Sequence, residues 1–187
     1  APVETPAGVY AFARDPESSK SVWSSEEGYP GDFRYREFYR DIGFDLQMET
    51  VKNYIHPMGI RVHTGIKYHR ITGKGECVEK QPYVEAWAEE AAASHAANFL
   101  FNRDLQCDYL EKFLGGPATV VCPYDAERFG HWWYEGPMWL GKVMRKALTE
   151  SHRVTLATPP EILAAHPELP RVSPAFSSWG AGGYAEF

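Results

Sequence analysis

The chain has 187 residues, a net charge of -6 and an aromatic content of 14%. Its length fits one domain with a substantial core, and its negative charge argues against a surface that binds nucleic acid or an anionic membrane. The sequence has no basic block, no signal-peptide pattern and no apolar run long enough to span a membrane. We therefore expect a cytoplasmic monomer that has neither a nucleic acid nor a membrane as partner.

The three cysteines, Cys77, Cys107 and Cys122, form no CxxC pair and have no zinc-ligand spacing with histidine. Isolated cysteines of this kind are usually reduced core residues. The sequence thus predicts neither a metal nor a cofactor. The aromatic excess fits a carbohydrate-binding cleft, where rings stack on the apolar faces of sugars.

The first predicted elements are a strand at residues 8–13 and a loop at residues 14–31. Loops of this length are often lids or binding loops, and Trp23 and Tyr29 are its aromatic residues. The alternative is a surface connection whose rings pack against the body.

A helix is predicted from Asp32, as its cap, to Arg40, and Asp41 and Asp45 follow. The two acids and Arg40 suit sugar hydroxyls, but they equally fit a solvated ion pair between arginine and aspartate. Residues 60–72 alternate apolar and polar side chains, which indicates an extended segment or a strand.

The longest predicted helix covers residues 82–113 and is ended by Gly115, Gly116 and Pro117. His95 lies on its apolar stripe, where a hydrogen-bonded core histidine is more common than a ligand. A second helix begins at Gly136, with an inward face formed by Trp139, Val143 and Ala147. A strand at residues 153–157 and a short helix with capping-box spacing at residues 158–165 follow.

The central motif is the apolar run 118–122 followed by the sequence PYDAERFGHWW at residues 123–133. The run predicts a buried strand that ends at Pro123, because proline cannot donate to a sheet ladder. Ligands in α/β folds bind beyond the carboxyl ends of strands, so the polar and aromatic residues after Pro123 indicate a site. The alternative is a connecting loop in which Asp125 caps the next helix.

The order of predicted strands and helices is that of an α/β protein with a parallel sheet or barrel. The chain opens on Ala1 without methionine and stops after a glycine-rich segment at residues 180–183. We expect it to be a piece of a longer protein, truncated at both ends.

Several long motifs together resemble glycoside hydrolase family 57, and within it the 1,4-alpha-glucan branching enzymes. They are RDPESS at 14–19, YRDIGFDL at 39–46, TGIKYHRITG at 64–73, PYDAERFGHWW at 123–133 and SSWGAGG at 177–183. The resemblance covers nearly the whole chain. It implies that residues 1–187 are the C-terminal part of an incomplete, seven-stranded (β/α) TIM-like barrel.

The resemblance also implies site residues and a substrate. Asp125 matches the acid/base of a retaining mechanism, and the matching glutamate nucleophile lies upstream of this chain, so the fragment alone is expected to be inactive. The substrate is an alpha-1,4-glucan such as amylose, glycogen or starch. The implied substrate contacts are Trp179, Arg40, Gly59 and Phe44; Tyr29 belongs to the lid, and His131 and Trp132 position Asp125.

Two other functions stay open. A hydrolase or a 4-alpha-glucanotransferase of the same family uses the same pair of carboxyl groups and differs in how the acceptor is held. A non-catalytic glucan-binding protein would keep the aromatic platforms and have no need of the acid.

Overall fold

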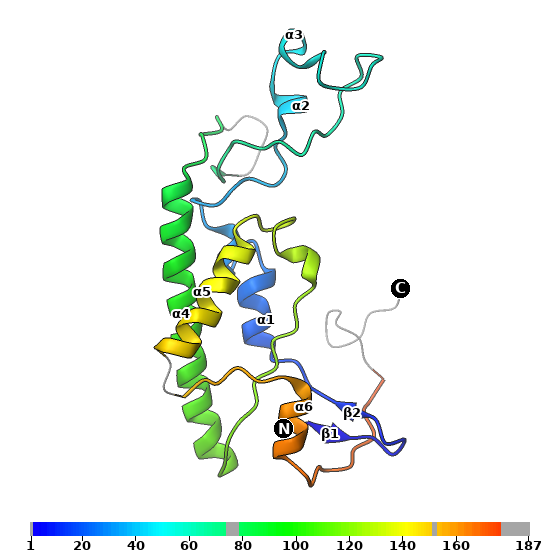
Figure 1. The fold of residues 1–187 in the computed structure, drawn as a ribbon, viewed down its shortest axis with the longest axis vertical. Helices are drawn as coiled ribbons and strands as arrows, with labels where there is room; N and C mark the ends of the chain where they lie inside the picture. The colour runs from blue at the N-terminus through cyan, green and yellow to red at the C-terminus, as the bar shows by residue number, and fades with distance from the viewer. Residues whose placement is uncertain (1, 74–78, 151–152, 177–187) are drawn as a thin grey trace.

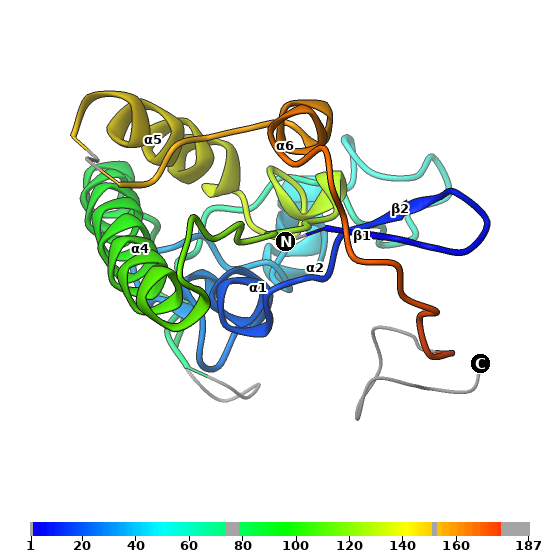
Figure 2. The same cartoon turned by 90° about the horizontal axis from the view of Figure 1, so that it is seen from below.

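The structure is a computed structural model that describes residues 2–73, 79–150 and 153–176. Its body is made by three helices, α1 (Pro16–Trp23), α4 (Glu85–Leu114) and α5 (Gly136–Thr149). In Figures 1 and 2, α5 packs along α4, and α1 runs beside α4 at a different position on its circumference.

Smaller elements lie at the two ends of this body (Figure 1). The short helices α2 (Ile42–Asp45) and α3 (Met48–Val51) form a lobe at one end. The strands β1 (Val3–Glu4) and β2 (Tyr10–Ala11) lie at the other end with α6 (Pro159–Ala165). Two 3-10 turns complete the elements, η1 at Tyr29–Gly31 and η2 at Ala126–Arg128.

The long helix α4 confirms the prediction for residues 82–113. Its buried residues recur every three or four positions, the spacing of one helix face; they are Ala88, Ala91, Ala92, Ala96, Phe99, Leu100 and Arg103. The small alanine side chains let neighbouring segments approach the helix closely. The helix ends where Gly115 takes φ = 73°, a left-handed conformation that suits glycine.

The predicted helices at 136 and 158 are also confirmed. Trp139, Val143 and Ala147 of α5 are buried as expected. Trp139 is fully buried, and its ring lies edge-on to Phe99 at a centroid distance of 5.2 Å. At α6, Thr158 and Glu161 form the expected capping box.

The prediction of a continuous loop at residues 14–31 is wrong, because α1 occupies its first half. Asp15 caps the helix by accepting a hydrogen bond from the Ser18 amide at 2.8 Å. The buried residues of α1 are Ser18, Ser19 and Val22, so the face of the helix that points inward is mostly serine. Only Val22 on this face is apolar, so apolar spacing gave little sign of the helix, and the start signal of Asp15 as cap with Pro16 at the first position was overlooked.

The helix predicted at residues 32–40 is wrong as well. The Asp32 carboxylate accepts from the Arg34 amide at 2.9 Å and closes a turn there instead. The chain then becomes extended, and Arg36 pairs with Arg70 in an isolated antiparallel bridge. Residues 60–72 form no regular strand; His69 and Arg70 within them make isolated bridges to Pro82 and Arg36.

The predicted strands are confirmed only in part. Tyr10–Ala11, within the predicted strand 8–13, pairs antiparallel with Val3–Glu4. Residues 118–122 and 153–157 form no strand and belong to no sheet among the described residues. An apolar, β-branched run favours extended backbone, but a ladder also needs a neighbouring strand. The described chain is therefore α/β with few strands.

The core predicts a large stability effect at Trp139. In the full-length protein, Trp139→Ala should cost about 3–5 kcal/mol of stability, the usual loss for a buried tryptophan. Thermal melts monitored by circular dichroism measure it. Phe113→Ala is the control, because Phe113 lies on α4 with 75% of its surface exposed. Equal melting temperatures for Trp139→Ala and wild type would contradict the packing described above.

Candidate active site

Asp125 stands directly before the 3-10 turn η2 in extended backbone, with φ = -68° and ψ = 134°. Its backbone carbonyl accepts a hydrogen bond from the Arg128 amide at 3.0 Å. Its half-buried side chain makes no capping hydrogen bond to the turn. Asp125 thus holds the N-cap position of η2 without a side-chain cap, and capping does not occupy the carboxylate.

The segment that carries Asp125 is attached to α1 on both sides of the acid. Before it, the Tyr124 hydroxyl donates to the Ser18 carbonyl at 3.1 Å. After it, the Arg128 guanidinium donates from Nε to the Val22 carbonyl at 3.2 Å and from a terminal nitrogen to the Trp23 carbonyl at 2.5 Å.

Beyond η2 the chain folds back and is held by the core. The Trp133 amide donates to the Arg128 carbonyl at 2.9 Å, and Gly130 bends the chain with φ = 93°. Trp133 is 2% exposed, with its ring 5.3 Å from that of Trp139. A Cβ atom on Gly136 would lie only 2.8 Å from the Phe129 ring, so glycine permits this close contact. The loop around Asp125 is thus fixed by packing at both ends.

His131 and Trp132 lie on the ring of Phe38. Trp132 stacks on Phe38 with a centroid distance of 4.4 Å, and His131 meets it edge-on at 5.5 Å. Trp132 keeps 43% of its surface exposed. The structure therefore gives both rings a contact with Phe38, and their positioning of Asp125 stays a prediction.

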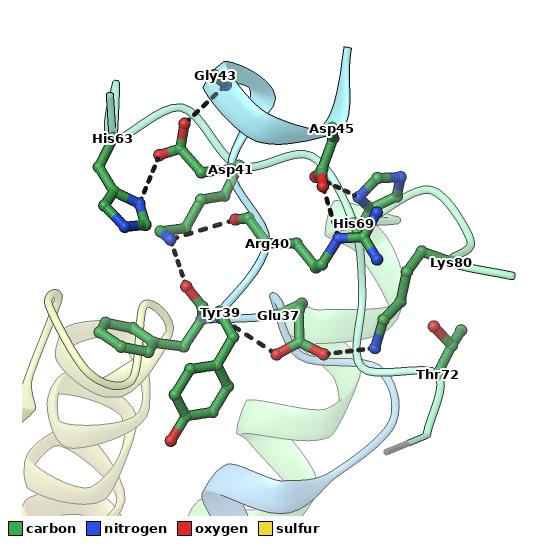
Figure 3. A network of polar contacts seen from close by, with 12 residues as sticks. Glu37, Tyr39, Arg40, Asp41, Gly43, Asp45, His63, His69, Thr72 and Lys80 are labelled. Atoms are coloured by element: carbon green, nitrogen blue, oxygen red, sulfur yellow. Dashed lines mark hydrogen bonds and ion pairs between the residues drawn. The ribbon is translucent and has the colours of Figure 1, made fainter. Parts of the chain in front are cut away.

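Arg40 belongs to a separate polar network near α2 (Figure 3). Its Nε donates to the Asp45 carboxylate at 2.6 Å, and the other oxygen of Asp45 lies 3.4 Å from Nδ1 of His69. Glu37 and Lys80 form a second ion pair in the same network at 2.9 Å. Arg40 and Asp45 form the ion pair that the sequence left open; the Asp45 side chain is largely buried, and that of Arg40 keeps 31% of its surface exposed.

The Asp41 carboxylate joins the start of α2 to the loop at residues 64–65 by hydrogen bonds. It is 2% exposed and accepts hydrogen bonds from the amides of Gly43, Thr64 and Gly65 at 2.9, 3.0 and 2.8 Å. The Thr64 hydroxyl adds another at 2.8 Å. Burial by itself raises the pKa of this carboxyl, but the hydrogen bonds outweigh it and lower the pKa from 3.8 to about 2. Asp41 is thus a structural anion.

Gly59 and Phe44, the other implied substrate contacts in this part of the chain, are both exposed. Gly59 has φ = 71°, and a Cβ atom there would have no neighbour within 4 Å. Its backbone is open to an approaching ligand. Phe44 is 47% exposed, with its ring 4.7 Å from that of His63. Trp179 lies outside the described residues.

Tyr29 is packed against the body. Its hydroxyl donates to Asn98 of α4 at 2.8 Å, and its ring stacks on His95 at 4.7 Å. His95 also shares a 2.8 Å hydrogen bond with the Tyr35 hydroxyl, as expected of a hydrogen-bonded core histidine. A lid function would require Tyr29 to leave these contacts, and it stays a prediction.

The sequence analysis missed two polar groups in this region, Glu135 and Ser18. Glu135 is 2% exposed and accepts from the Arg36 amide at 2.9 Å, and burial raises its pKa. The only signal for it was an acid among aromatic residues directly before Gly136. Ser18 had no signal, because its role depends on contacts with residues more than a hundred positions away.

Two searches of the described ranges gave negative results. Within them, no group of three or more histidine, cysteine or acidic side chains is placed to hold a metal ion. No helix of the described chain has the length and apolarity needed to cross a membrane.

Comparisons with known proteins find relatives that are named as glucan branching enzymes and an alpha-amylase, although no family profile matches the chain. The chain is 37% identical over 179 residues to the probable 1,4-alpha-glucan branching enzyme MT3115 of Mycobacterium tuberculosis (strain CDC 1551 / Oshkosh). The match covers 93% of the chain and 29% of that protein, so the chain spans less than a third of this relative.

Two crystal structures have the same fold over nearly the whole chain. The alpha-amylase AmyC from Thermotoga maritima matches with a TM-score of 0.88 and 49% identity, covering 97% of this chain and 35% of AmyC. The GH57-type branching enzyme from Pyrococcus horikoshii matches with a TM-score of 0.78 and 31% identity, covering 98% of this chain and 31% of that enzyme.

The chain is therefore homologous to a segment of glycoside hydrolases, and the resemblance to glycoside hydrolase family 57 is confirmed. Among the named relatives it resembles 1,4-alpha-glucan branching enzymes in sequence and in fold.

The buried carboxylate of Asp41 predicts a pH-dependent stability. Because its pKa falls from 3.8 to about 2 on folding, its contribution is present above about pH 4 and is lost as the pH falls through about 2. In the full-length protein, Asp41→Asn should cost about 2 kcal/mol of unfolding free energy at pH 7.

The measurement is urea denaturation of wild type and variant between pH 2 and pH 7, and the difference between them should shrink toward the acid end. Glu49→Gln, at an exposed position of α3, is the control and should show little difference at any pH. A constant difference for Asp41→Asn across this range would contradict the proposed origin of the stability.

Proposed function

We propose that the full-length protein containing this sequence is a 1,4-alpha-glucan branching enzyme. It would cleave an alpha-1,4 linkage by a retaining mechanism and form an alpha-1,6 branch on an acceptor glucan. The observation that carries the proposal is the position of Asp125. Its carboxylate makes no capping hydrogen bond, and it lies in the motif PYDAERFGHWW on a loop that is attached to α1 and to the core. The similarity to two branching enzymes supports it.

In this mechanism Asp125 acts first as an acid and then as a base. Its proton passes to the leaving glycosidic oxygen while a glutamate carboxylate attacks the anomeric carbon and the bond between that carbon and the oxygen breaks. The Asp125 carboxylate then takes the proton from the 6-hydroxyl of the acceptor, whose oxygen displaces the glutamate. The glutamate would belong to the part of the protein that precedes this sequence, so residues 1–187 alone would be inactive.

The same proposal sets the wider architecture. Residues 1–187 would contribute later strands and helices to an incomplete (β/α)7 barrel, and residues 118–122 would pair with strands from the rest of the protein. Asp125 would then stand beyond a strand end, where TIM-like barrels place catalytic groups. We expect a monomer in the cytoplasm.

Substrate contacts would come from residues that expose rings or open backbone. Trp179 would stack on a glucose ring, Gly59 would let a sugar approach the backbone, and Phe44 would line the acceptor side. Arg40 would offer donors that its bond to Asp45 does not occupy. His131 and Trp132 would help to position Asp125, and Tyr29 would act as a lid residue if it leaves α4.

A second candidate is hydrolysis of alpha-glucans. It is favoured by the similarity to the alpha-amylase AmyC, which is higher in identity and TM-score than that to the Pyrococcus horikoshii enzyme. Hydrolysis and branching share both carboxyl groups and differ in whether water or a glucan captures the glycosyl-enzyme. A 4-alpha-glucanotransferase would also fit this chemistry, whereas a non-catalytic glucan-binding protein would not need Asp125.

Replacing the proposed acid tests the function directly. In the full-length protein, Asp125→Asn should keep glucan binding and lose roughly 10²–10⁴-fold in the rate on amylose, the usual size of a general acid–base contribution. The rate is measured by iodine staining and by reducing ends, and binding by affinity electrophoresis. An Asp125→Asn variant with the wild-type rate would remove the assignment.

Phe44 tests whether an aromatic acceptor site favours branching. Wild-type protein on amylose should form new alpha-1,6 linkages, and Phe44→Ala should raise the ratio of new reducing ends to new branches, because water then competes better with the acceptor. Proton NMR and a reducing-end assay give the ratio. Tyr54→Ala, in the same lobe at 83% exposure, is the control. If wild type forms reducing ends alone, hydrolysis replaces branching.

A further inference from the structure

Arg128 fastens the turn after Asp125 to the C-terminal end of α1. Its guanidinium reaches the Val22 carbonyl from Nε at 3.2 Å and the Trp23 carbonyl from a terminal nitrogen at 2.5 Å. Its central carbon also lies 5.3 Å from the centre of the Trp23 ring. Three contacts thus hold one side chain, and its backbone amide bonds to the Asp125 carbonyl at 3.0 Å.

These contacts suit arginine in particular. Carbonyl oxygens at the end of a helix carry partial negative charge and attract a cation. A planar guanidinium satisfies two carbonyls in a fixed geometry while it lies near an aromatic ring, which the point charge of lysine does not reproduce. The guanidinium is half-buried, and burial lowers its pKa. A partly desolvated cation with two backbone acceptors resists displacement, because leaving them costs hydrogen bonds.

A second attachment holds the chain on the other side of Asp125. The Tyr124 hydroxyl donates to the Ser18 carbonyl at 3.1 Å, and Cys122 Sγ lies 3.1 Å from the Ser18 hydroxyl. Helix α1 is in turn joined to α4, because Gln106 donates to the capping carboxylate of Asp15 at 2.7 Å. The acid therefore stands between two side chains anchored on one helix, and that helix is anchored to the body.

We propose that Arg128 is a positioning residue for Asp125, with Tyr124 as its partner on the other side; this inference rests on the proposed function. By holding η2 against α1, Arg128 keeps the Asp125 carboxyl in line with the leaving oxygen. It touches neither the reacting atoms nor the glucan. Its loss should impair the proton transfer and leave glucan binding intact, since a displacement of about 1 Å in a catalytic group costs up to about 10²-fold in rate.

The experiment compares two substrates in the full-length protein. Amylose needs a proton on its leaving oxygen, whereas alpha-maltosyl fluoride releases fluoride ion without one, so its first step bypasses the acid. Arg128→Lys should lose about 10- to 100-fold in kcat on amylose with little change in KM. The initial burst of fluoride from alpha-maltosyl fluoride should stay within about twofold of wild type. Asp125→Asn should show the same pattern in a stronger form.

Two further variants keep the test decisive. Tyr124→Phe removes only the hydroxyl that bonds to Ser18, and it should repeat the pattern more weakly while preserving the ring in the core. Arg153→Lys is the matched control, because Arg153 pairs with Asp108 at 3.0 Å on the exposed side of α4 and should leave both rates unchanged. If Arg128→Lys fails to fold, Tyr124→Phe carries the comparison.

The possible results separate the two proposals. An equal loss on amylose and in the fluoride burst, or a raised KM with unchanged kcat, would overturn the positioning role in favour of a general or direct substrate contact. An unchanged rate on amylose for Arg128→Lys would overturn it too. Failure of the proposed function looks different, because Asp125→Asn itself would then turn amylose over at the wild-type rate.

Discussion

The described site depends on the hydrogen bonds that the Asp15 carboxylate accepts. It caps α1 through the Ser18 amide at 2.8 Å, and it accepts from Gln106 of α4 at 2.7 Å. Burial opposes its charge, but these hydrogen bonds and the nearby Arg103 lower its pKa below 3.8. The Asp15 amide also donates to the Val121 carbonyl at 2.8 Å. One residue thus joins α1, α4 and the segment that leads to Asp125.

This arrangement explains why a short helix matters so much. Helices as short as α1, with 8 residues, are marginal in water, so its stability must come from its cap and its packing. Its C-terminal carbonyls then serve as acceptors for Arg128, and its inner face meets Tyr124 and Cys122. The position of the proposed acid is therefore set by tertiary contacts of α1 more than by the local turn.

The same reasoning separates what the sequence predicts from what it does not. The helices α4, α5 and α6 were predictable, because apolar periodicity, Gly115 and the capping box of Thr158 are local signals. Helix α1 was missed because serine covers most of its buried face, although Asp15 and Pro16 are a local start signal. The strand predicted at residues 118–122 is not formed in the described chain, because a ladder depends on a partner strand that local sequence does not reveal. Asp125 was predicted from its motif, but the hydrogen bonds of Tyr124 and Arg128 to α1 join residues about a hundred positions apart, which no local pattern indicates.

The aromatic residues of this chain lie in two different environments, a packed core and the exposed surface. The sequence analysis took their abundance as a sign of carbohydrate binding, yet many of the rings form one packed core around Trp139. Phe129 stacks on it with planes 6° apart, and Trp133 lies 5.3 Å away. The adjacent Trp132 is 43% exposed and stacks on Phe38 instead.

Since two neighbouring tryptophans have opposite environments, aromatic content by itself is weak evidence for a sugar site. The buried rings serve to hold the loop of Asp125 rigid. Among the exposed rings, Phe44 is one that the proposed function assigns to glucan contact. In the double displacement proposed above, the same carboxyl donates a proton and later takes one near the same point, and the packing of Phe129 and Trp133 against Trp139 helps to hold its loop in place.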